Sequence, residues 1–229
     1  MIQVAGVRDR AEAALLQECG IHYLGFPLRL PVNREDLTEA EAAAIICSIR
    51  PPARGVLITY LDRAEAIADF CRSMGARVVQ LHGDVPAPEL ARLRELDSEL
   101  TIVKSLVVGR HPVTVLERLA LELAPLVDGF LTDTYAPETG ASGATGRTHD
   151  WAVSRRLVEL SPRPVILAGG LTPANVREAI AAVRPAGVDV HTGVEDASGR
   201  KDRTKLLGFV AEARAGFARA PWSAPGRRG

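Results

Sequence analysis

Short apolar runs alternate with helical stretches rich in Ala, Leu, Arg and Glu along nearly the whole chain. The runs hold four or five residues each and read as buried strands. They are residues 2–5, 22–26, 55–59, 77–81, 101–104, 129–132, 165–168 and 188–191. Because strands and helices alternate, this pattern predicts a parallel sheet whose faces are covered by helices.

The predicted helices carry recognisable start signals. They span residues 11–18, 38–48, 64–74, 86–96, 113–123, 151–160, 173–183 and 204–213. Asp9 stands where it can cap the first helix, and Thr38 with Glu41 matches a capping box. About eight strand–helix units are therefore present.

Eight such units in 229 residues predict an α/β protein with a single (β/α)8 barrel, the TIM barrel. An open doubly wound sheet is the alternative, but it usually has fewer units and a Gly-rich first turn. Gly6-Val7-Arg8 does not match GxGxxG. We expect a barrel domain over residues 1–217 and a flexible tail over residues 218–229, where Pro, Gly and Arg occur without apolar periodicity.

Charge and cysteine content exclude several classes of partner. The 28 basic and 28 acidic residues leave no net charge, which argues against nucleic acid or an anionic membrane as the main partner. No apolar run approaches the roughly 18 residues of a membrane span, and the first residues do not resemble a signal peptide. The three cysteines lack metal-ligand spacing, so we expect reduced thiols in the cytoplasm.

In a barrel of this kind, the carboxyl ends of the strands converge on one face. The residues at those ends are Ala5, Phe26, Tyr60, His82, Lys104, Asp133, Gly169-Gly170 and His191-Thr192-Gly193. The two longest loops, residues 27–37 and 134–150, follow strand ends on the same face. A carboxyl group, two imidazoles, a lysine and two Gly-rich turns predict an acid–base site that also binds an anion.

The two Gly-rich turns predict where the anion binds. Barrels commonly hold phosphate after the seventh and eighth strands, on backbone N–H groups and a short helix. Gly169 and Gly170 follow the seventh predicted strand, and Thr192 with Gly193 follows the eighth. Tight turns without a ligand are the alternative interpretation.

Several collinear motifs resemble one enzyme family, the phosphoribosylanthranilate isomerases. The motifs include Leu24-Gly25-Phe26, Val79-Gln80-Leu81-His82-Gly83, Leu131-Thr132-Asp133-Thr134, Gly143-Ala144-Thr145-Gly146-Arg147, Leu167-Ala168-Gly169-Gly170-Leu171 and Gly187-Val188-Asp189-Val190. The similarity runs from Gln3 to about Leu207.

The resemblance implies an Amadori rearrangement of an N-(5-phosphoribosyl) arylamine to a 1-arylamino-1-deoxyribulose 5-phosphate, as in tryptophan biosynthesis. It implies no cofactor and no metal, a small-molecule substrate, and a monomer or homodimer. The roles that it implies are Asp133 as general acid, Arg34 on the substrate carboxylate, Gln80, Gly143, Thr145 and Gly146 as substrate-binding residues, and Gly169, Gly170, Asp189, His191, Thr192 and Gly193 around the phosphate.

Elementary chemistry supports the role of Asp133. A carboxyl group in a closed, partly apolar site has a raised pKa and can donate a proton near neutral pH. A solvated strand-end carboxylate or a helix cap is the alternative interpretation.

The first strand departs from the family pattern. The family reads Lys-Ile-Cys-Gly, with the cysteine as the base, whereas this chain reads Gln3-Val4-Ala5-Gly6. Ala5 cannot accept a proton, and general acid–base participation is worth roughly 10²–10⁴-fold in rate. His82 is one candidate for the missing base, or else an orienting hydrogen-bond donor. His191 is a second candidate for the base. Its alternative roles are a charge-assisted hydrogen bond to the phosphate, or packing alone.

The loop predicted to meet the aryl group is also altered. Arg34 is preceded by Pro31-Val32-Asn33, Arg29 competes for the same role, and Ala144 replaces a family glycine. Two hypotheses follow. The chain is an isomerase of the family's substrate or a paralogue for another phosphoribosyl amine, or it is a non-catalytic descendant that binds a phosphosugar or a protein.

Overall fold

The computed structural model describes residues 1–31, 35–136, 141–142 and 148–222. Its strands are β1 (Ile2–Ala5), β2 (Tyr23–Pro27), β3 (Arg54–Thr59), β4 (Val78–Leu81), β5 (Thr101–Val108), β6 (Gly129–Ala136), β7 (Ala141–Ser142), β8 (Val165–Leu167) and β9 (Gly187–Val190). Its α-helices are α1 (Arg10–Glu18), α2 (Glu39–Ser48), α3 (Ala64–Met74), α4 (Ala87–Leu96), α5 (Val113–Leu123), α6 (Trp151–Leu160), α7 (Val176–Val183) and α8 (Arg203–Arg219). A 3-10 turn, η1, spans Thr192–Val194.

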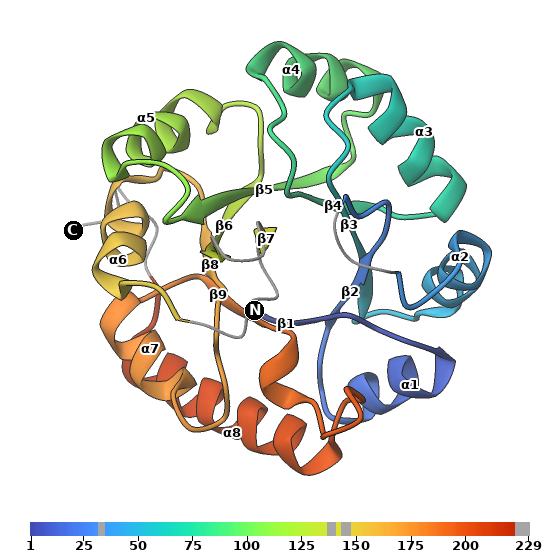
Figure 1. The fold of residues 1–229 in the computed structure, drawn as a ribbon, viewed down its shortest axis with the longest axis vertical. Coiled ribbons are helices and arrows are strands. Elements are labelled where there is room, and N and C mark those ends of the chain that lie inside the picture. Colours follow the sequence, from blue (N-terminus) through green and yellow to red (C-terminus); the bar gives the residue numbers. More distant parts are fainter. Residues whose placement is uncertain (32–34, 137–140, 143–147, 223–229) are drawn as a thin grey trace.

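The strands close into a barrel. Parallel pairing runs in the order β5-β4-β3-β2-β1-β9-β8-β6, and β5 also pairs with β6 to complete the ring. The helices surround the strands as an outer ring (Figure 1). The (β/α)8 barrel expected from the alternating pattern is therefore confirmed.

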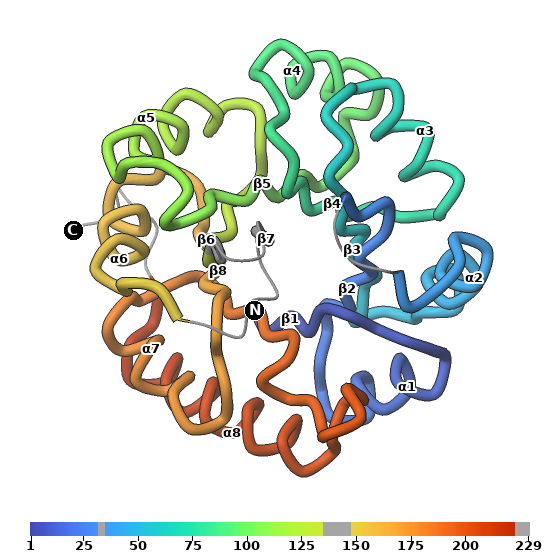
Figure 2. Tube along the Cα trace, viewed as in Figure 1, coloured from blue at the N-terminus to red at the C-terminus, as the bar shows by residue number. Residues whose placement is uncertain are grey.

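The two ends of the barrel sequence meet where β1 pairs with β9. Gln3 lies opposite Asp189 and Val4 opposite Val190 in this pair. Figure 2 shows the N-terminal trace (blue) running beside the C-terminal part of the barrel (orange). This closure places residues from opposite ends of the chain in one site.

Two layers of apolar packing hold the barrel together. The outer layer lies between strands and helices and includes fully buried Leu24, Phe70, Phe130 and Phe209. Inside the barrel, Ala5 packs in a smaller apolar cluster with Val56, Ile58 and Val78. Burial of a large apolar side chain contributes about 1.5–3 kcal/mol, so both layers stabilise the closed ring.

The predicted helix start signals are present. The Asp9 carboxylate accepts a hydrogen bond from the backbone N–H of Glu12 at 2.8 Å, and this caps α1. Thr38 and Glu41 form the capping box at the start of α2. Both caps satisfy N–H groups that a helix leaves without partners.

Some element bounds differ from the predicted ones. β5 and β6 continue to Val108 and Ala136, because the two strands pair with each other as far as Val108 and Thr134. Part of the predicted loop 134–150 therefore belongs to β6, and β7 pairs antiparallel with the end of that strand. Helix α8 extends to Arg219, two residues beyond the predicted domain boundary at residue 217. Residues 223–229 of the predicted tail lie outside the described residues.

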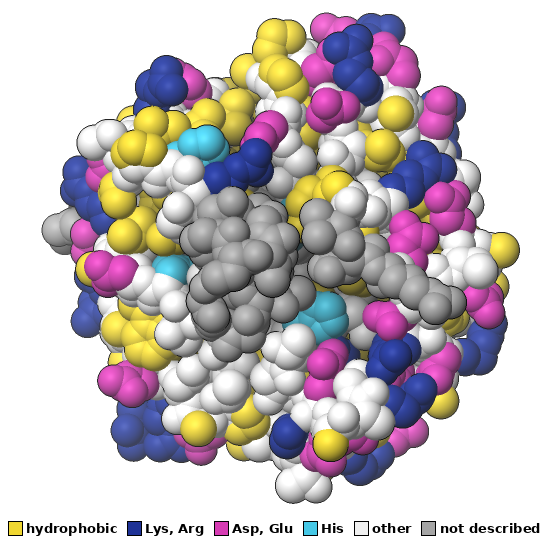
Figure 3. All heavy atoms as spheres, viewed as in Figure 1, with side chains coloured by type: hydrophobic (Ala, Val, Ile, Leu, Met, Phe, Trp, Pro, Cys, Tyr) yellow, Lys and Arg dark blue, Asp and Glu magenta, His cyan; other side chains and the backbone are white. Residues whose placement is uncertain are grey.

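Charges of both signs are mixed over the molecular face shown in Figure 3. Lys and Arg side chains (dark blue) alternate with Asp and Glu side chains (magenta) around its edge, and His side chains (cyan) lie nearer the centre. This mixture agrees with the zero net charge. In the described part of the chain, no helix has the length and apolar character that crossing a bilayer requires.

Candidate active site

One cavity lies at the carboxyl ends of β6, β8 and β9, and we call it the mouth cavity. It is lined by Asp133, by residues 168–171 and by residues 189–193. All of the residues expected around the phosphate, together with the expected acid, thus line a single cavity.

Asp133 lies near the end of β6 and only 6% of its surface is exposed. Its Oδ1 accepts a hydrogen bond from the backbone N–H of Thr134 at 2.7 Å. Burial raises the pKa of Asp133 to about 7, against the lowering effect of that N–H. A carboxyl group with this pKa can hold a proton near neutral pH and release it to a substrate.

Asp189 is a second buried carboxyl group in the same cavity. It is also 6% exposed, and its Oδ1 has no hydrogen-bond partner among the residues that the structure describes. Burial, and then the negative charge of Asp133, raise the pKa of Asp189 to about 8, while Gln3 and Lys201 oppose this shift. Because the charge of Asp133 acts on Asp189, the two carboxyl groups titrate as a coupled pair.

A chain of side-chain hydrogen bonds crosses the barrel interior from β1 to β4. The Gln3 Nε2 group donates to Gln80 Oε1 at 2.7 Å, and Gln80 Nε2 lies 2.7 Å from His82 Nε2. Because the Gln80 amide nitrogen can only donate, His82 Nε2 accepts and a neutral ring carries its proton on Nδ1. This arrangement makes His82 a hydrogen-bond donor through Nδ1.

His82 and Lys104 line a different cavity. This second cavity, about 200 Å³ in volume, lies beside the ends of β4 and β5 and also contacts Asp84, Arg110 and His111. Lys104 Nζ donates to the carbonyl oxygen of Ser105 at 2.8 Å, and burial lowers the pKa of Lys104 to about 8. Not all of the strand-end residues therefore meet in the mouth cavity.

The position of the family cysteine offers no proton acceptor. The Ala5 side chain is buried in the apolar cluster with Val56, Ile58 and Val78. His191 lies close by, because a Cβ atom added to Gly6 would be 2.1 Å from His191 Nε2. The imidazole thus covers the backbone next to Ala5.

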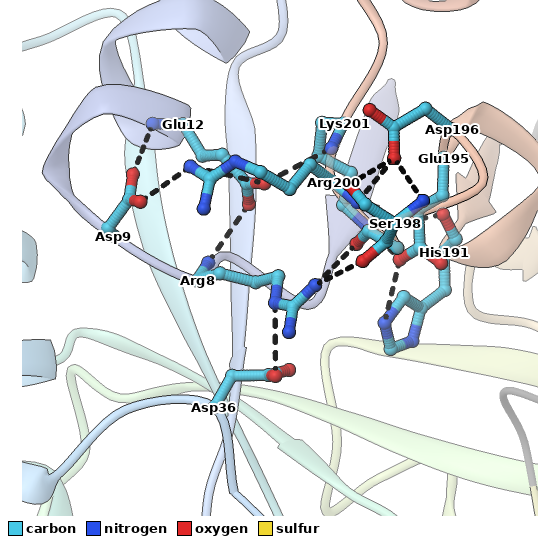
Figure 4. A network of polar contacts seen from close by, with 11 residues as sticks. Arg8, Asp9, Glu12, Asp36, His191, Glu195, Asp196, Ser198, Arg200 and Lys201 are labelled. Carbon is cyan, nitrogen blue, oxygen red and sulfur yellow. Dashed lines mark hydrogen bonds and ion pairs between the residues drawn. The ribbon is translucent and has the colours of Figure 1, made fainter.

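His191 is oriented by a carboxylate–lysine pair. His191 Nε2 lies 3.4 Å from Glu195 Oε1, which accepts a hydrogen bond from Lys201 Nζ at 2.7 Å (Figure 4). Lys201 Nζ also donates to the His191 carbonyl oxygen at 3.1 Å. Burial, and then the charges of Lys201 and Arg8, lower the pKa of His191 to about 3, so the ring is neutral at physiological pH.

The same network ties the loop after β1 to the loop after η1. Arg8 Nη1 donates to the carbonyl oxygen of Gly199 at 2.9 Å, and Arg8 also pairs with Asp36 at 3.1 Å (Figure 4). The buried Glu12 accepts from the backbone N–H groups of Arg8 and Lys201 at 3.0 and 3.1 Å. These bonds hold the loop after β1 against the loop that follows η1.

The Gly-rich turns pack tightly against their neighbours. Gly169 and Gly170 have φ values of 92° and 62°, which favour glycine. A Cβ atom on Gly193 would lie 1.9 Å from the Leu171 carbonyl oxygen. Asn175 holds the first turn by donating to the Gly170 carbonyl oxygen at 3.0 Å. The two turns are shaped for backbone approach to an anion, and their role as phosphate ligands stays a prediction.

Several predicted residues lie outside the described residues, namely Arg34, Gly143, Thr145 and Gly146. The competing Arg29 is engaged elsewhere, because its Nε lies 2.8 Å from Glu39 Oε1 and its guanidinium stacks 3.8 Å above the Phe70 ring centre. No group of three or more His, Cys, Asp or Glu side chains suited to a metal ion occurs in the described residues.

Sequence reasoning missed Gln3, Glu195 and Lys201 as parts of the site. The departure of Gln3 from the family's lysine was visible, but its contact with Asp189 depends on the β1–β9 register. Glu195 and Lys201 were not singled out from the sequence. Their contact with His191 depends on the fold of the loop between η1 and α8.

Comparisons with known proteins agree with this geometry. Residues 7–212 match the family model described as N-(5'phosphoribosyl)anthranilate (PRA) isomerase. The chain is 39% identical to N-(5'-phosphoribosyl)anthranilate isomerase of Haloferax volcanii, covering 93% of this chain and 92% of that protein. It is 36% identical to N-(5'-phosphoribosyl)anthranilate isomerase 2 of Methanosarcina mazei, covering 94% and 95% of the two chains. The crystal structure of the Thermotoga maritima enzyme is similar, with a TM-score of 0.77, 29% identity and coverage of 93% and 98%.

Proposed function

The chain belongs to the N-(5'-phosphoribosyl)anthranilate isomerase family and is an aldose–ketose isomerase, and on this basis we propose how its own residues rearrange the substrate. The substrate is an N-(5-phosphoribosyl) arylamine, with anthranilate as the arylamine to test first. The product is the 1-arylamino-1-deoxyribulose 5-phosphate. This reaction moves protons and leaves the overall oxidation state unchanged.

Asp133 is the general acid of this proposal. Its carboxyl group is buried in the mouth cavity with a pKa raised to about 7 by burial, and this single observation carries the assignment. The acid donates its proton to the ribose ring oxygen O4. The C1–O4 bond then breaks, and the lone pair of the arylamine nitrogen forms the C1=N bond of a Schiff base.

The second half of the reaction needs a base. The base removes the proton on C2, the C–H electrons form the C1=C2 bond, and the C=N electrons return to nitrogen. The resulting enol becomes the ketone when O2 loses one proton and C1 gains one. Ala5 cannot supply this base because its side chain is a methyl group.

The phosphate group is assigned to the turns around Gly169, Gly170, Thr192 and Gly193. Their position after β8 and β9 supports this assignment, because barrels bind phosphate there through backbone N–H groups. For the substrate carboxylate we propose Arg34, on the basis of the family resemblance. Gln80, Gly143, Thr145 and Gly146 are proposed to contact the substrate on the same basis.

Turnover of freshly generated N-(5-phosphoribosyl)anthranilate by the purified protein tests this function. We expect product formation by the wild-type chain and its loss in Asp133→Asn, which keeps the shape of the side chain but cannot act as an acid. Exposed Asp69→Asn is the matched control and should retain full activity. A wild-type protein that binds the substrate without turnover would contradict the proposal.

Ala5 favours one alternative function, a phosphosugar-binding protein without catalysis. Its place in an apolar cluster removes the family base, whereas the mouth cavity with its two turns persists. A paralogue for another phosphoribosyl amine is a further possibility that the altered loop around Arg34 raises. A reduced product analogue, reduced 1-(o-carboxyphenylamino)-1-deoxyribulose 5-phosphate, tests for binding without turnover. If the protein binds this analogue but turns over no phosphoribosyl arylamine, the first alternative is correct.

For the cellular setting, we propose a cytoplasmic location and a monomer or homodimer. The three thiols of Cys19, Cys47 and Cys71 are free. Free thiols suit a reducing compartment.

A further inference from the structure

We propose that Asp189 is the base that Ala5 fails to provide, so that Asp133 and Asp189 together supply the acid and the base of the rearrangement. This inference rests on the proposed function and adds a second catalytic residue to it. It also assigns the Asp189 side chain a role other than phosphate binding.

The position of Asp189 carries the inference. Its carboxyl group and that of Asp133 line the same cavity, on β9 and β6, which are separated only by β8 (Figure 1). Asp189 Oδ1 is buried and has no hydrogen-bond partner among the described residues. A buried carboxyl oxygen without a partner is costly, so its presence in a cavity points to use by a ligand.

The charges around the pair keep a proton available near neutral pH. Gln3 from β1 is a neutral hydrogen-bond donor to Asp189, and Lys201 is the cation that acts on it from beyond β9. Lys201 is itself engaged by Glu195 Oε1 at 2.7 Å. Burial, and then the negative charge of Asp133, raise the pKa of Tyr60 to about 12. The Tyr60 hydroxyl group is therefore neutral near pH 7.

These surroundings give the pair one proton over a narrow pH range. The pKa values of Asp133 and Asp189 are raised to about 7 and about 8, chiefly by burial. Between these values the pair holds one proton and one negative charge, which is the state that offers an acid and a base together. The proton can reside on either carboxyl group, because the two values lie close together.

The two histidines are weaker candidates for the base. His82 lines the second cavity, and its Nε2 already accepts a hydrogen bond from Gln80. His191 faces the mouth cavity, but its pKa is lowered to about 3 by burial and by the Lys201 and Arg8 charges. Proton abstraction is most efficient when the pKa of the base lies near the working pH, which favours Asp189.

Asp133 and Asp189 together can donate and accept the protons of the ring-opening and C2 deprotonation steps. Asp133 gives its proton to O4 and becomes a carboxylate, while the Asp189 carboxylate takes the proton from C2. The pair therefore holds one proton before and after these two steps. Transfer of that proton from Asp189 to Asp133 restores the starting form, and exchange at O2 and C1 with solvent completes the ketone.

The first experiment compares Asp189→Asn with the wild type and with Asp69→Asn, using N-(5-phosphoribosyl)anthranilate. We expect kcat/KM of Asp189→Asn to fall on the order of 10²–10⁴-fold. Its affinity for the reduced product analogue, which needs no proton transfer, should change little. Thermal unfolding of each variant checks that the barrel is intact.

A rescue experiment separates a base from a merely structural residue. Adding Ala5→Cys to Asp189→Asn places a thiol at the position of the family cysteine, and we expect it to restore at least about a tenth of the lost activity if only a base is missing. A structural defect at Asp189 would not respond to a thiol at residue 5.

The outcomes distinguish this inference from the proposed function. Wild-type activity that is lost in Asp133→Asn but retained in Asp189→Asn would overturn the role of Asp189 and leave the isomerase function standing. Loss of activity in Asp189→Asn that Ala5→Cys does not restore would also overturn it. An inactive wild type would count against the proposed function itself.

Discussion

Gln3 and Asp189 lie opposite each other in the β1–β9 pair, and the Gln3 amide hydrogen-bonds to the Asp189 carboxyl group. The same amide donates to Gln80 Oε1 at 2.7 Å, so one uncharged side chain links the carboxyl pair to the polar chain that ends at His82. Gln3 is an uncharged amide and not a cation, so it lowers the pKa of Asp189 less than burial raises it. The pKa of Asp189 therefore stays high.

Replacing this amide by a cation tests the electrostatics of the pair. In Gln3→Lys, a positive charge beside Asp189 favours the carboxylate, so its pKa falls from about 8. The pH optimum of kcat/KM should therefore move to lower pH. Gln3→Met removes the hydrogen bond without adding charge and should move this optimum in the opposite direction. Identical profiles for the three proteins would show that neither limb reports Asp189.

The two buried carboxyl groups also predict how stability depends on pH. Both have folded-state pKa values, about 7 and about 8, that lie above the ordinary aspartate value of 3.8. The folded state therefore binds more protons than the unfolded state, and stability is lost as the pH rises from about 4 to about 8. Asp189→Asn should remove part of this loss and raise the free energy of unfolding at pH 9 by a few kcal/mol relative to wild type.

Denaturant unfolding at pH 5 and pH 9 checks this expectation. Asp69→Asn, on the exposed face of α3, is the control and should show the pH dependence of the wild type. A variant Asp189→Asn that loses as much stability as the wild type between these two pH values would contradict the raised pKa.

Gly6 and His191 should be coupled in a double-mutant cycle. A methyl group on Gly6 would meet His191 Nε2 at 2.1 Å, and Gly6 also has a φ of 78°. Gly6→Ala should destabilise the protein by the steric clash plus about 1–2 kcal/mol for the left-handed backbone. In the His191→Ala background the clash disappears and only the backbone cost is expected to remain. Equal destabilisation in both backgrounds would mean that the ring moves away at no cost.

The turn after β9 should tolerate no side chain at Gly193. A Cβ atom there would lie 1.9 Å from the Leu171 carbonyl oxygen, a backbone atom of the neighbouring turn. Gly193→Ala should therefore distort both turns and weaken binding of inorganic phosphate and of the reduced product analogue by at least about tenfold, or 1.4 kcal/mol.

The matched control for this glycine lies in helix α8. At Gly208 the nearest atom to an added Cβ is Pro173 Cβ at 3.6 Å, so the methyl group fits. Gly208→Ala should keep phosphate affinity and raise stability by about 0.5–1 kcal/mol, because alanine loses less backbone freedom in a helix. Titration calorimetry measures the phosphate affinity of both variants. Equal affinities for Gly193→Ala and Gly208→Ala would show that Gly193 is not part of the phosphate site.

Local patterns were sufficient to predict the architecture. The alternation of short apolar runs with helical stretches, together with caps such as Asp9 and Thr38, depends only on neighbouring residues and predicts the barrel before any contact is known. The converging strand ends then brought Asp133, Gly169 and Gly193 to one face. Strand lengths were less predictable, because β5 and β6 extend to Val108 and Ala136 by pairing with each other.

The chemistry of the site depends on distant parts of the chain. That Ala5 cannot act as a base follows from its identity alone, but the sequence does not show which group can replace it. The answer depends on closure of the barrel, which buries Asp189 beside Asp133 and gives it Gln3 as a neighbour. Burial and mutual repulsion exist only in the folded protein, since an exposed carboxyl group in an unfolded chain ionises near the ordinary aspartate pKa of 3.8. The residue types were thus readable from the sequence, whereas their proton affinities were set by the tertiary structure.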